Sequence, residues 1–455
     1  MEKIFQAQKT FFLQGKTKDV SFRLKQLKKL KSIIKENESL ILEALEKDLH
    51  KPKFEAYASE LGVIYEEIHK VIKNLKKWTK AQRVDSPLTL FPARSKIYYE
   101  PLGVVLIIAP WNYPFQLTIS PLIGALAAGN CVVIKPSEMA SHTEEVITQL
   151  INAHFRHEYI FVVKGGVEEC QKLLKQHFDF IFFTGSTNIG KIVMKEAAEH
   201  LTPVCLELGG KSPCIVDQDA NINISAKRIT WGKFFNAGQT CVAPDYLYVH
   251  ESIKKDFVEK MKEHILSFYG ENPEKSENLG RIINKKHFDR LNALIDKTKT
   301  IFGGKTDEKN LYISPTLFDS VSWNDRMMQE EIFGPLFPIL TYRNLEEVIE
   351  SINRHPKPLA LYFFSNNKEN QDKILSRVSF GGGCINDCVM HVSNSNLPFG
   401  GIGSSGMGSY HGKFSFETFS HKKSILKNTF WFDLKLRYAP YNDKRIKLAR
   451  WFLEK

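Results

Sequence analysis

The segment around Cys241 has residue types that suit covalent catalysis. Cys241 lies in 234-FFNAGQTCVAP-244, directly after the small residues that begin at Gly238. A thiolate at this position can attack a carbonyl carbon and form an acyl–sulfur bond. Glu207, beside two glycines in LELGGKSP, is a base for water, and Asn112, between prolines in APWNYPF, offers an amide N–H to an oxyanion. Together these three residue types indicate thioester chemistry.

Two simpler interpretations of the cysteine stay open at this point. A lone cysteine is more often a buried filler of the core than a nucleophile. A cysteine protease would need a histidine partner, and a distant histidine partner is possible.

The turn at residues 184–190 is a second feature that could bind a ligand, because the apolar run FDFIFF ends there and a helix is expected to follow. Gly185, Gly190 and Lys191 match the phosphate loop of ATP-binding proteins, but the next residue, Ile192, cannot ligate magnesium. ATP hydrolysis is therefore disfavoured, and we expect Ile192 to belong to the helix core. A helix N-terminus with unpaired N–H groups suits a dinucleotide pyrophosphate, although a routine strand-to-helix turn has the same residues.

The remaining motifs favour structural roles. The G-x-G-x-x-G pattern at 401–406 follows no strand, so we expect a tight irregular loop. The histidines of 154-HFRH-157 have no third ligand nearby and no HExxH occurs, so we expect no metal site. Cys384 and Cys388 have the spacing of neither a zinc site nor a redox pair, which favours buried thiols. His411 is a candidate for the lining of the substrate entrance.

The order of apolar segments predicts an α/β protein with two parallel sheets. Residues 20–82 have apolar residues at helical spacing. From residue 97 onward, solidly apolar runs such as VVLII and CVVIK alternate with helical segments, which is typical of parallel strands buried on both faces. A second strand–helix series starts near Gly209–Gly210, where we place a domain boundary. The proline-containing stretch 83–100 breaks both patterns and predicts a projecting hairpin.

Composition and charge exclude several other classes of protein. The chain has 455 residues, too many for one compact core, and a net charge of +12. We find neither a basic patch interleaved with aromatic residues nor a recognisable binding module, so no nucleic-acid partner is expected. No apolar run is long enough to span a membrane and no secretory signal is recognisable, so we expect a cytoplasmic protein with reduced thiols.

Seven motifs, in this order, resemble the successive signatures of the aldehyde dehydrogenase superfamily: LIIAPWNYPF, VIKPSE, FFTGSTNIGK, LELGGKSP, NAGQTCVAP, EEIFGP and LPFGGIGSSGMG. The match extends from about residue 60 to residue 425 and is most similar to the class 3 branch, which acts on fatty and aromatic aldehydes. The resemblance implies NAD(P)-dependent oxidation of an aldehyde to an acid, with two Rossmann-like domains and a small oligomerisation β-element.

The resemblance also implies a role for individual residues. Cys241 would be the nucleophile, Asn112 an oxyanion donor and Glu207 the base for water. Lys135 and Glu138 would contact the adenine-side ribose, and a carboxylate there favours NAD without excluding NADP. All the residues implied to contact the cofactor are Trp111, Lys135, Glu138, Thr184, Gly185, Ser186, Thr187, Asn188, Ile189, Gly190, Glu331 and Phe333.

The resemblance predicts the following division of the chain. The cofactor-binding domain comprises 1–82 and 100–208 with a returning segment 398–418, the catalytic domain 209–397, and the oligomerisation element 83–99 and 419–430, followed by a basic tail, 431–455. We expect a homodimer. The tail, with Ile446, Ala449, Trp451 and Phe452 among basic residues, is expected to pack on the body or on a partner subunit rather than on an anionic membrane surface.

Two rival functions also follow from the sequence. A relative that passes its thioester to CoA or reduces an acyl donor would keep the nucleophile, but Glu207 favours release to water. A catalytically inactive scaffold is disfavoured because Cys241, Glu207 and Asn112 occur together. The physiological aldehyde stays open.

Overall fold

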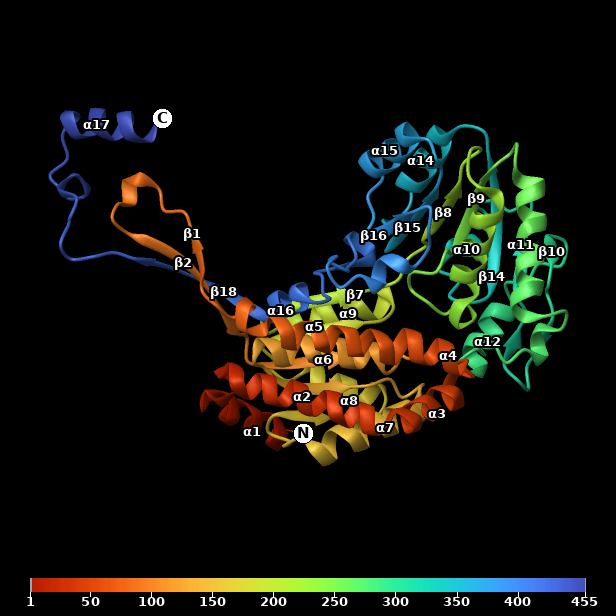
Figure 1. The fold of residues 1–455 in the computed structure, drawn as a ribbon, viewed down its shortest axis with the longest axis horizontal. Helices are drawn as coiled ribbons and strands as arrows, with labels where there is room; N and C mark the ends of the chain where they lie inside the picture. Colours follow the sequence, from red (N-terminus) through yellow and green to blue (C-terminus); the bar gives the residue numbers. More distant parts are fainter. Residues whose placement is uncertain (1, 455) are drawn as a thin grey trace.

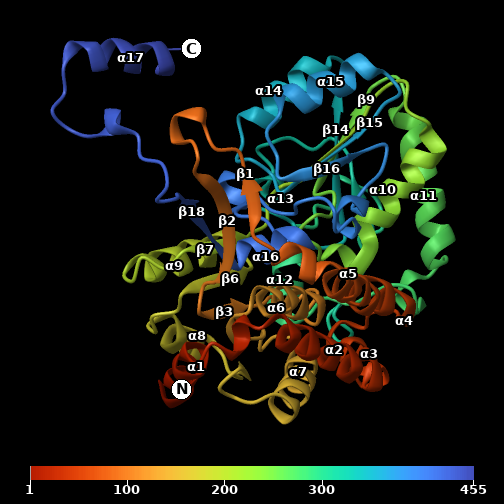
Figure 2. The same ribbon diagram turned by 60° about the vertical axis from the view of Figure 1, so that its left-hand side comes forward.

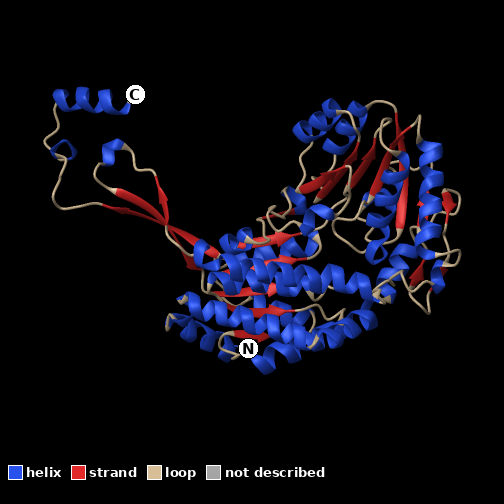
Figure 3. Cartoon of the chain, viewed as in Figure 1, coloured by secondary structure: helices blue, strands red, loops and turns tan. Residues whose placement is uncertain are grey.

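The computed structural model describes residues 2–454 of the chain. Within these residues, a six-stranded and a seven-stranded sheet form the centres of two helix-covered layers, and a three-stranded antiparallel sheet projects away from both (Figure 1, Figure 3). The predicted α/β class with two largely parallel sheets and a small additional β-element is confirmed.

The six-stranded sheet has the order β17-β7-β6-β3-β4-β5. Its strands are β3 (Val104–Ile108), β4 (Cys131–Lys135), β5 (Ile160–Val162), β6 (Phe180–Thr184), β7 (Val204–Glu207) and β17 (Gly406–Met407). Every residue of β3, β4 and β6 is buried, as expected for parallel strands covered on both faces. The exception to the parallel arrangement is β17, which pairs antiparallel with β7 after a chain excursion through the other sheet.

Helices of the N-terminal half cover this sheet. They are α1 (Glu2–Leu13), α2 (Val20–Glu36), α3 (Glu38–Leu49), α4 (Lys53–Ala56), α5 (Val63–Trp78), α6 (Gln116–Ala128), α7 (Ser141–His154), α8 (Val167–Leu174) and α9 (Thr187–Ala198), with α16 (Lys413–Thr418) added later. The α2 helix begins where the Asp19 carboxylate accepts the Ser21 N–H, and its apolar stripe is buried. A π-helical turn, Tyr57–Gly62, separates α4 from α5.

The seven-stranded sheet has the order β10-β13-β14-β9-β8-β15-β16, with β10 antiparallel at one edge. Its strands are β8 (Pro213–Val216), β9 (Tyr246–His250), β10 (Thr300–Phe302), β13 (Thr316–Phe318), β14 (Leu336–Tyr342), β15 (Ala360–Phe364) and β16 (Gly382–Ile385). The helices of this half are α10 (Ile222–Phe234), α11 (Lys254–Tyr269), α12 (Lys285–Asn292), α13 (Arg326–Gln329), α14 (Leu345–Asn353) and α15 (Lys368–Arg377), and β11 (Thr306–Asp307) pairs with β12 (Tyr312–Ile313).

A projecting arm combines segments from both ends of the sequence. The hairpin of β1 (Gln82–Val84) and β2 (Arg94–Pro101) is extended by β18 (Ser420–Lys427), which pairs antiparallel along the whole of β2. Figure 1 and Figure 2 show this arm leaving the body, with α17 (Asp443–Leu453) beyond it. Among the described residues, no helix is long and apolar enough to cross a membrane.

Candidate active site

The carboxyl ends of β3, β6 and β7 open into a cleft of about 610 Å³ whose wall contains residues from both large sheets. The sequence-predicted residues that line it are Trp111, Asn112, Thr184, Gly185, Ser186, Thr187, Asn188, Glu207, Cys241, Glu331 and Phe333. Within the described chain, the lining does not include Lys135, Glu138, Ile189 or Gly190. The structure therefore brings the three candidate catalytic residues together with most, but not all, of the candidate cofactor contacts.

Cys241 is held by a loop with an unusual backbone. After α10, residues Asn236, Ala237 and Gly238 all have left-handed φ values, of 51°, 52° and 74°. Gly238 is required there, because a Cβ atom would lie 2.3 Å from the carbonyl oxygen of Gly334. Two consecutive non-glycine residues at positive φ store strain, so surrounding contacts must hold this loop in place.

The Asn112 side chain is fastened to the same loop. Its Nδ2 donates to the backbone carbonyl of Gln239 at 3.1 Å, and the side chain of Asn236 donates to that same carbonyl at 3.1 Å. The neighbouring Tyr113 hydroxyl lies 2.7 Å from the hydroxyl of Thr240, which precedes Cys241 in the sequence. Hydrogen bonds thus join Asn112 to the loop that carries Cys241, although 129 positions separate the two residues in the sequence.

The environment of the Cys241 sulfur favours the protonated thiol. Burial raises the pKa of Cys241 to about 12, and the carboxylates of Glu331 and Glu207 act in the same direction. The backbone N–H groups of Cys241 and Val242 oppose this rise in pKa by donating to the sulfur. The side chain of Cys241 is therefore a neutral thiol with two amide donors beside it.

Glu207 ends β7 and has a carboxylate oxygen without a hydrogen-bond partner among the described residues. The side chain is buried, Oε1 accepts from the Cys205 thiol at 3.8 Å, and Oε2 is the unpaired atom. Burial is the main reason why the pKa of Glu207 lies well above its usual range. A buried carboxyl with one free oxygen facing a cleft is a strong base once it is ionised.

Glu331 and Phe333 belong to a loop that hydrogen bonds to Asp245 hold in place. Asp245 accepts the Ile332 N–H at 2.8 Å and the Lys211 ammonium at 2.5 Å. Burial, with Asp245 nearby, raises the pKa of Glu331 to about 8. A Cβ atom at Gly209 would lie 2.0 Å from a Glu331 oxygen, so a glycine there leaves room for the carboxyl group.

The glycine turn between β6 and α9 presents a helix N-terminus to the cleft. Gly185 N–H donates to the Glu207 carbonyl at 3.0 Å, and the buried Thr184 hydroxyl has no partner among the described residues. Gly190 faces Leu208, where a Cβ atom would come within 2.6 Å. Ile192 is 51% exposed, so the expectation that it belongs to the helix core is wrong, because α9 buries Gly190, Val193 and Ala197 on its other face. Ile189 is likewise exposed.

Lys135 and Glu138 lie just beyond the lined part of the cleft. Lys135 is buried at the end of β4 and donates to the Pro136 carbonyl at 2.5 Å and to Glu138 at 3.3 Å. The Glu138 side chain is half-exposed. Their assignment to the adenine-side ribose stays a prediction.

The structure also shows the surroundings of the glycine-rich motif at 401–406 and of His411. Gly403–Ser405 form a short 3-10 turn and Gly406 begins β17, so the predicted tight loop is present but its last residue belongs to a strand. His411 is buried and stacks on Phe399 with ring centres 5.2 Å apart, and burial lowers the pKa of His411 to about 3. Among the described residues, no group of three His, Cys, Asp or Glu side chains could hold a metal ion.

Several contributors to the site were missed by the sequence. His287 and Arg290 from α12 and Tyr410 line the cleft, and the His287 ring lies 4.9 Å from the Trp111 ring. Lys51, which follows the end of α3, donates a hydrogen bond to the Asn112 carbonyl, although nothing in the sequence marks this lysine as buried. The helical pattern of residues 20–82 contains no signal that separates this buried lysine from its exposed neighbours.

Comparison with known proteins gives a consistent picture. The model of the "Aldehyde dehydrogenase family" matches residues 1–425. The 4,4'-diaponeurosporen-aldehyde dehydrogenase of Staphylococcus aureus (strain NCTC 8325 / PS 47) is 52% identical over 446 residues, covering 98% of this chain and 97% of that protein. Aldehyde dehydrogenase family 3 member B3 of Mus musculus is 47% identical, covering 99% of this chain and 94% of that protein.

Solved structures have the same fold. One described as the substrate bound state of Staphylococcus Aureus AldH has a TM-score of 0.97 at 51% identity, covering 99% of each chain. A mutant of P. syringae AldA, an indole-3-acetaldehyde dehydrogenase in complex with NAD+ and IAA, has a TM-score of 0.86 at 26% identity, covering 94% of this chain and 88% of that one. With the motifs, the cleft and these matches combined, the chain belongs to the aldehyde dehydrogenase family.

Proposed function

We propose that this enzyme oxidises an apolar aldehyde to a carboxylic acid with NAD or NADP, through a thioester on Cys241. The observation that carries the proposal is the convergence, in one cleft, of a thiol, a buried carboxylate with a free oxygen and an amide donor. This division of labour among three residue types matches acyl transfer from sulfur to water.

The residues present fit a dinucleotide. The helix α9 N-terminus, the unpartnered Thr184 hydroxyl and Ser186 would hold its phosphates, and Glu331 would accept hydroxyl groups of a ribose. Phe333 and Trp111, whose ring centres are 5.3 Å apart, would border the nicotinamide side. When bound, the nicotinamide supplies the acceptor for the electron pair that leaves the aldehyde carbon.

Addition of the thiol is the first step for the protein's own groups. The Cys241 thiol releases its proton to solvent water, and Sγ forms a bond to the carbonyl carbon as the carbon–oxygen double bond opens. The carbonyl oxygen becomes an oxyanion, which the second N–H of the Asn112 amide and the Cys241 backbone N–H would receive. Removing one such donor typically costs about 3 to 4 kcal/mol of transition-state stabilisation.

Hydrolysis of the thioester is the second step. Glu207 draws a proton from water, the water oxygen bonds to the acyl carbon, and the carbon–sulfur bond breaks. The departing sulfur then takes up the proton that Glu207 holds, which restores the Cys241 thiol and the Glu207 carboxylate. The free Oε2 of Glu207 is the atom that would accept this proton. The unusually high basicity that burial gives this carboxylate supports the role.

Mass spectrometry tests the proposal. Protein quenched during turnover of an aldehyde with NAD should carry an acyl group on the peptide that contains Cys241, and Cys241→Ser should neither acylate nor oxidise aldehyde while it still binds NADH. An acyl group on another residue, or turnover by Cys241→Ser, would refute the mechanism. Acid formed without CoA distinguishes hydrolysis from transfer to CoA.

The substrate class follows from the relatives. The S. aureus relative is named for 4,4'-diaponeurosporen-aldehyde. We therefore propose a long, apolar aldehyde, aliphatic or polyene, for this chain as well. A panel of aldehydes of increasing chain length should show kcat/KM rising with length; a preference for short polar aldehydes contradicts this proposal.

A homodimer formed through the arm is the proposed assembly. The outer edge of β18 is one of two unpaired edges of its sheet in the described chain, and large side chains of the arm and of the segment after it are exposed, Leu88 by 85% and Trp431 by 71%. Such an edge and such side chains need a cover. Light scattering should give twice the 52.2 kDa chain mass, and Leu426→Lys on β18 should shift the protein towards monomer. A wild-type monomer at micromolar concentration contradicts the dimer.

The tail is proposed to pack on the partner subunit. In Figure 1 it extends beyond the body, so contact with its own body is not its arrangement here, and Ile446 and Leu453 are exposed. The side chain of Phe452 lies outside the described part. Co-sedimentation with anionic liposomes would instead favour a membrane surface.

Two further features support the proposed compartment and domain division. The seven free thiols support a reducing, cytoplasmic compartment. The two sheets support the division into cofactor-binding and catalytic domains.

A further inference from the structure

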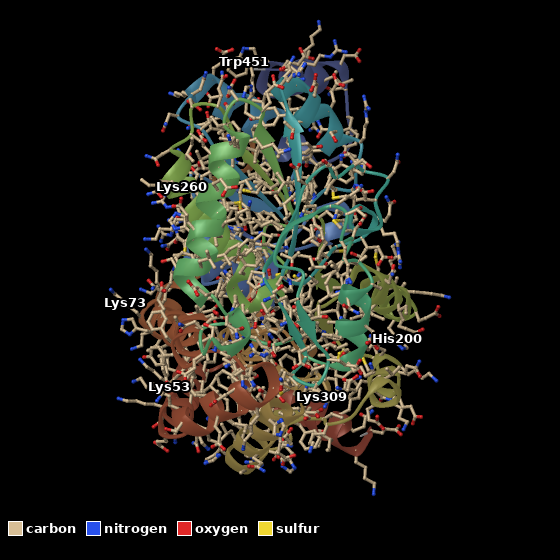
Figure 4. All side chains as sticks on the ribbon, turned by 90° about the vertical axis from the view of Figure 1, so that its right-hand side faces the viewer. Lys53, Lys73, His200, Lys260, Lys309 and Trp451 are labelled. Atoms are coloured by element: carbon tan, nitrogen blue, oxygen red, sulfur yellow. The ribbon has the colours of Figure 1, made fainter. Side chains whose placement is uncertain are left out.

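A lysine and a glutamate are fully buried behind the catalytic loop. The side chains of Lys51 and Glu60 both have 0% exposure, and their charged atoms are 2.5 Å apart. Lys53, two residues away, lies on the outer surface (Figure 4). A buried ion pair is weak evidence for stability, because desolvation of both charges offsets their attraction. Its other contacts therefore decide what the pair does.

The remaining bonds of the pair go to the segment that carries Asn112. The Lys51 ammonium donates to the Asn112 carbonyl at 3.2 Å and lies 4.1 Å from the centre of the Tyr113 ring. The second oxygen of Glu60 accepts the N–H groups of Phe115 and Gln116, each at 3.0 Å, at the start of α6. The π-helical turn 57–62 buries Glu60 and Leu61 side by side and so directs this carboxylate inward.

A second carboxylate from the same connection holds the loop of Cys241. Glu55 accepts the Asn236 N–H at 2.9 Å, at the first of the three left-handed residues. The Asn236 side chain then donates to the Asn112 carbonyl at 2.8 Å and to the Gln239 carbonyl at 3.1 Å. The Asn112 carbonyl thus receives both the Lys51 ammonium and the Asn236 amide, which joins the two supports at one atom.

We propose that Lys51, Glu60 and Glu55 are positioning residues that set the oxyanion donor Asn112 and the nucleophile loop in register with one another. This inference rests on the proposed function, since Asn112 is an oxyanion donor only in that mechanism. None of the three charged side chains lines the cleft. Their effect on the reaction is therefore exerted through Asn112 and the loop 236–241, not by contact with the substrate.

A double-mutant cycle tests the proposal. Lys51→Met/Glu60→Gln removes both charges while keeping similar volumes, which avoids leaving one buried charge alone. We expect it to lower kcat by about tenfold or more with the KM for NAD unchanged. In the Asn112→Ala background the same pair of changes should have less than about a threefold effect, because the donor that it positions is gone. Equal factors in the two backgrounds, or wild-type kcat, would overturn the proposal.

Arg23→Met is the matched control. Arg23 is also a buried cation that donates to backbone carbonyls, those of Thr17, Lys18 and Ala127, but Ala127 is at the opposite end of α6 from the site. Any loss of activity from Arg23→Met should be the same with and without Asn112→Ala. This comparison separates positioning from a general loss of stability.

Hydrogen exchange gives a readout that does not depend on the mechanism. Lys51→Met/Glu60→Gln should speed amide exchange at residues 112–116 and 236–241 relative to the control, and Glu55→Gln should do so at 236–241. Unchanged exchange in both segments overturns the positioning role. If Asn112→Ala turns over at the wild-type rate while exchange rises as expected, the oxyanion assignment has failed and the positioning role has not.

Discussion

At the scale of single residues, burial disfavours the charged forms of three side chains in the cleft. Burial raises the pKa of Cys241, and burial also raises the pKa values of Glu331 and Glu207. Each anionic form would be costly beside the other two, because like charges in a poorly solvated site oppose ionisation. The thiol therefore needs activation at the moment of attack, which the two backbone N–H groups beside it provide in part.

The rate at which iodoacetamide alkylates Cys241 in cofactor-free enzyme reports the fraction of this thiol that is ionised. With a pKa of about 12, the thiolate fraction grows tenfold per pH unit, so the rate should rise from pH 7 to pH 9 without a plateau. Glu331→Gln should raise the rate roughly two- to tenfold, and only above about pH 8, where Glu331 is ionised. Glu330→Gln serves as the control. A plateau near pH 8 in the wild type would contradict the raised pKa.

Replacing the base should separate the two halves of the reaction. In Glu207→Gln, acylation of Cys241 still proceeds but no side chain accepts the proton of water. A rapid burst of one equivalent of NADH should precede a steady-state rate lowered by about 10²- to 10⁴-fold. Stopped-flow absorbance at 340 nm measures both phases, with the exposed Glu199→Gln as control. Full steady-state turnover would move the base role elsewhere, with Glu331 as the next candidate.

At the scale of elements, the loop between α10 and β9 decides where Cys241, the proposed nucleophile, lies. Three residues at positive φ turn the chain back towards Asn112, and the carbonyl of Gly334 leaves no room for a side chain at Gly238. Three hydrogen bonds hold the strained loop: Glu55 accepts the Asn236 N–H, the Gln239 side chain donates to the Asn236 carbonyl, and the Asn236 side chain donates to the Asn112 carbonyl. A disturbance of this loop should therefore reach the chemistry as well as the fold.

Gly238→Ala tests this expectation. An alanine in this left-handed conformation is strained, and its Cβ atom would also lie 2.3 Å from the Gly334 carbonyl oxygen, so the free energy of unfolding should fall by about 2 kcal/mol or more. Misplacement of Cys241 should lower kcat by about tenfold or more. Gly166→Ala is the control, because its φ is −99° and a Cβ there would meet nothing within 4 Å. Urea unfolding and steady-state kinetics check both effects.

The sequence predicts some elements far better than others, for physical reasons. The solidly apolar runs of β3, β4 and β6 were recognisable because parallel strands are buried on both faces. The turn of Gly185 follows such a run and was found with it. The sequence does not single out Lys51, since a lysine near exposed Lys53 has no local mark of burial. Its partners, the Glu60 carboxylate and the Asn112 carbonyl, are brought to it by the fold.

Faces of helices were also misjudged where the packing partner was unknown. Ile192 is apolar and follows a glycine turn, yet α9 turns Val193 and Ala197 inward instead. The return of the chain to pair with β7 involves two residues, Gly406 and Met407, which are too few for a strand pattern. Such features depend on tertiary contacts that no local periodicity encodes.

At the scale of the whole molecule, buried carboxyl groups link stability to pH. Glu67 is buried between α5, α6 and α16, accepts the Gly412 N–H at 3.2 Å and contacts Ser120 and Ser415. Burial raises the pKa of Glu67 to about 7 from an ordinary 4.5. A carboxyl whose pKa is higher in the folded state contributes stability at low pH, and that contribution falls as pH rises from 4.5 through 7.

Glu67→Gln should remove this part of the pH dependence. Between pH 4.5 and pH 8 the free energy of unfolding of the wild type should fall relative to that of the variant by on the order of 3 kcal/mol. Glu66→Gln, on the exposed face of the same helix, should run parallel to the wild type. Urea denaturation at several pH values provides the data. A constant difference between wild type and Glu67→Gln would show that Glu67 ionises equally in both states.

The antiparallel pairing of β17 with β7, the strand that ends at Glu207, has a consequence for biosynthesis. Val204–Glu207 reach the ribosome exit about 200 residues before Gly406 and Met407, which at roughly 5 to 20 residues per second is a delay of about 10 to 40 s. During that interval the edge of β7 that later pairs with β17 has unpaired backbone N–H and C=O groups. The six-stranded sheet can therefore be completed only after Gly406 and Met407 have been synthesised. A chaperone that covers the free edge of β7 during this interval would raise the yield of newly synthesised enzyme.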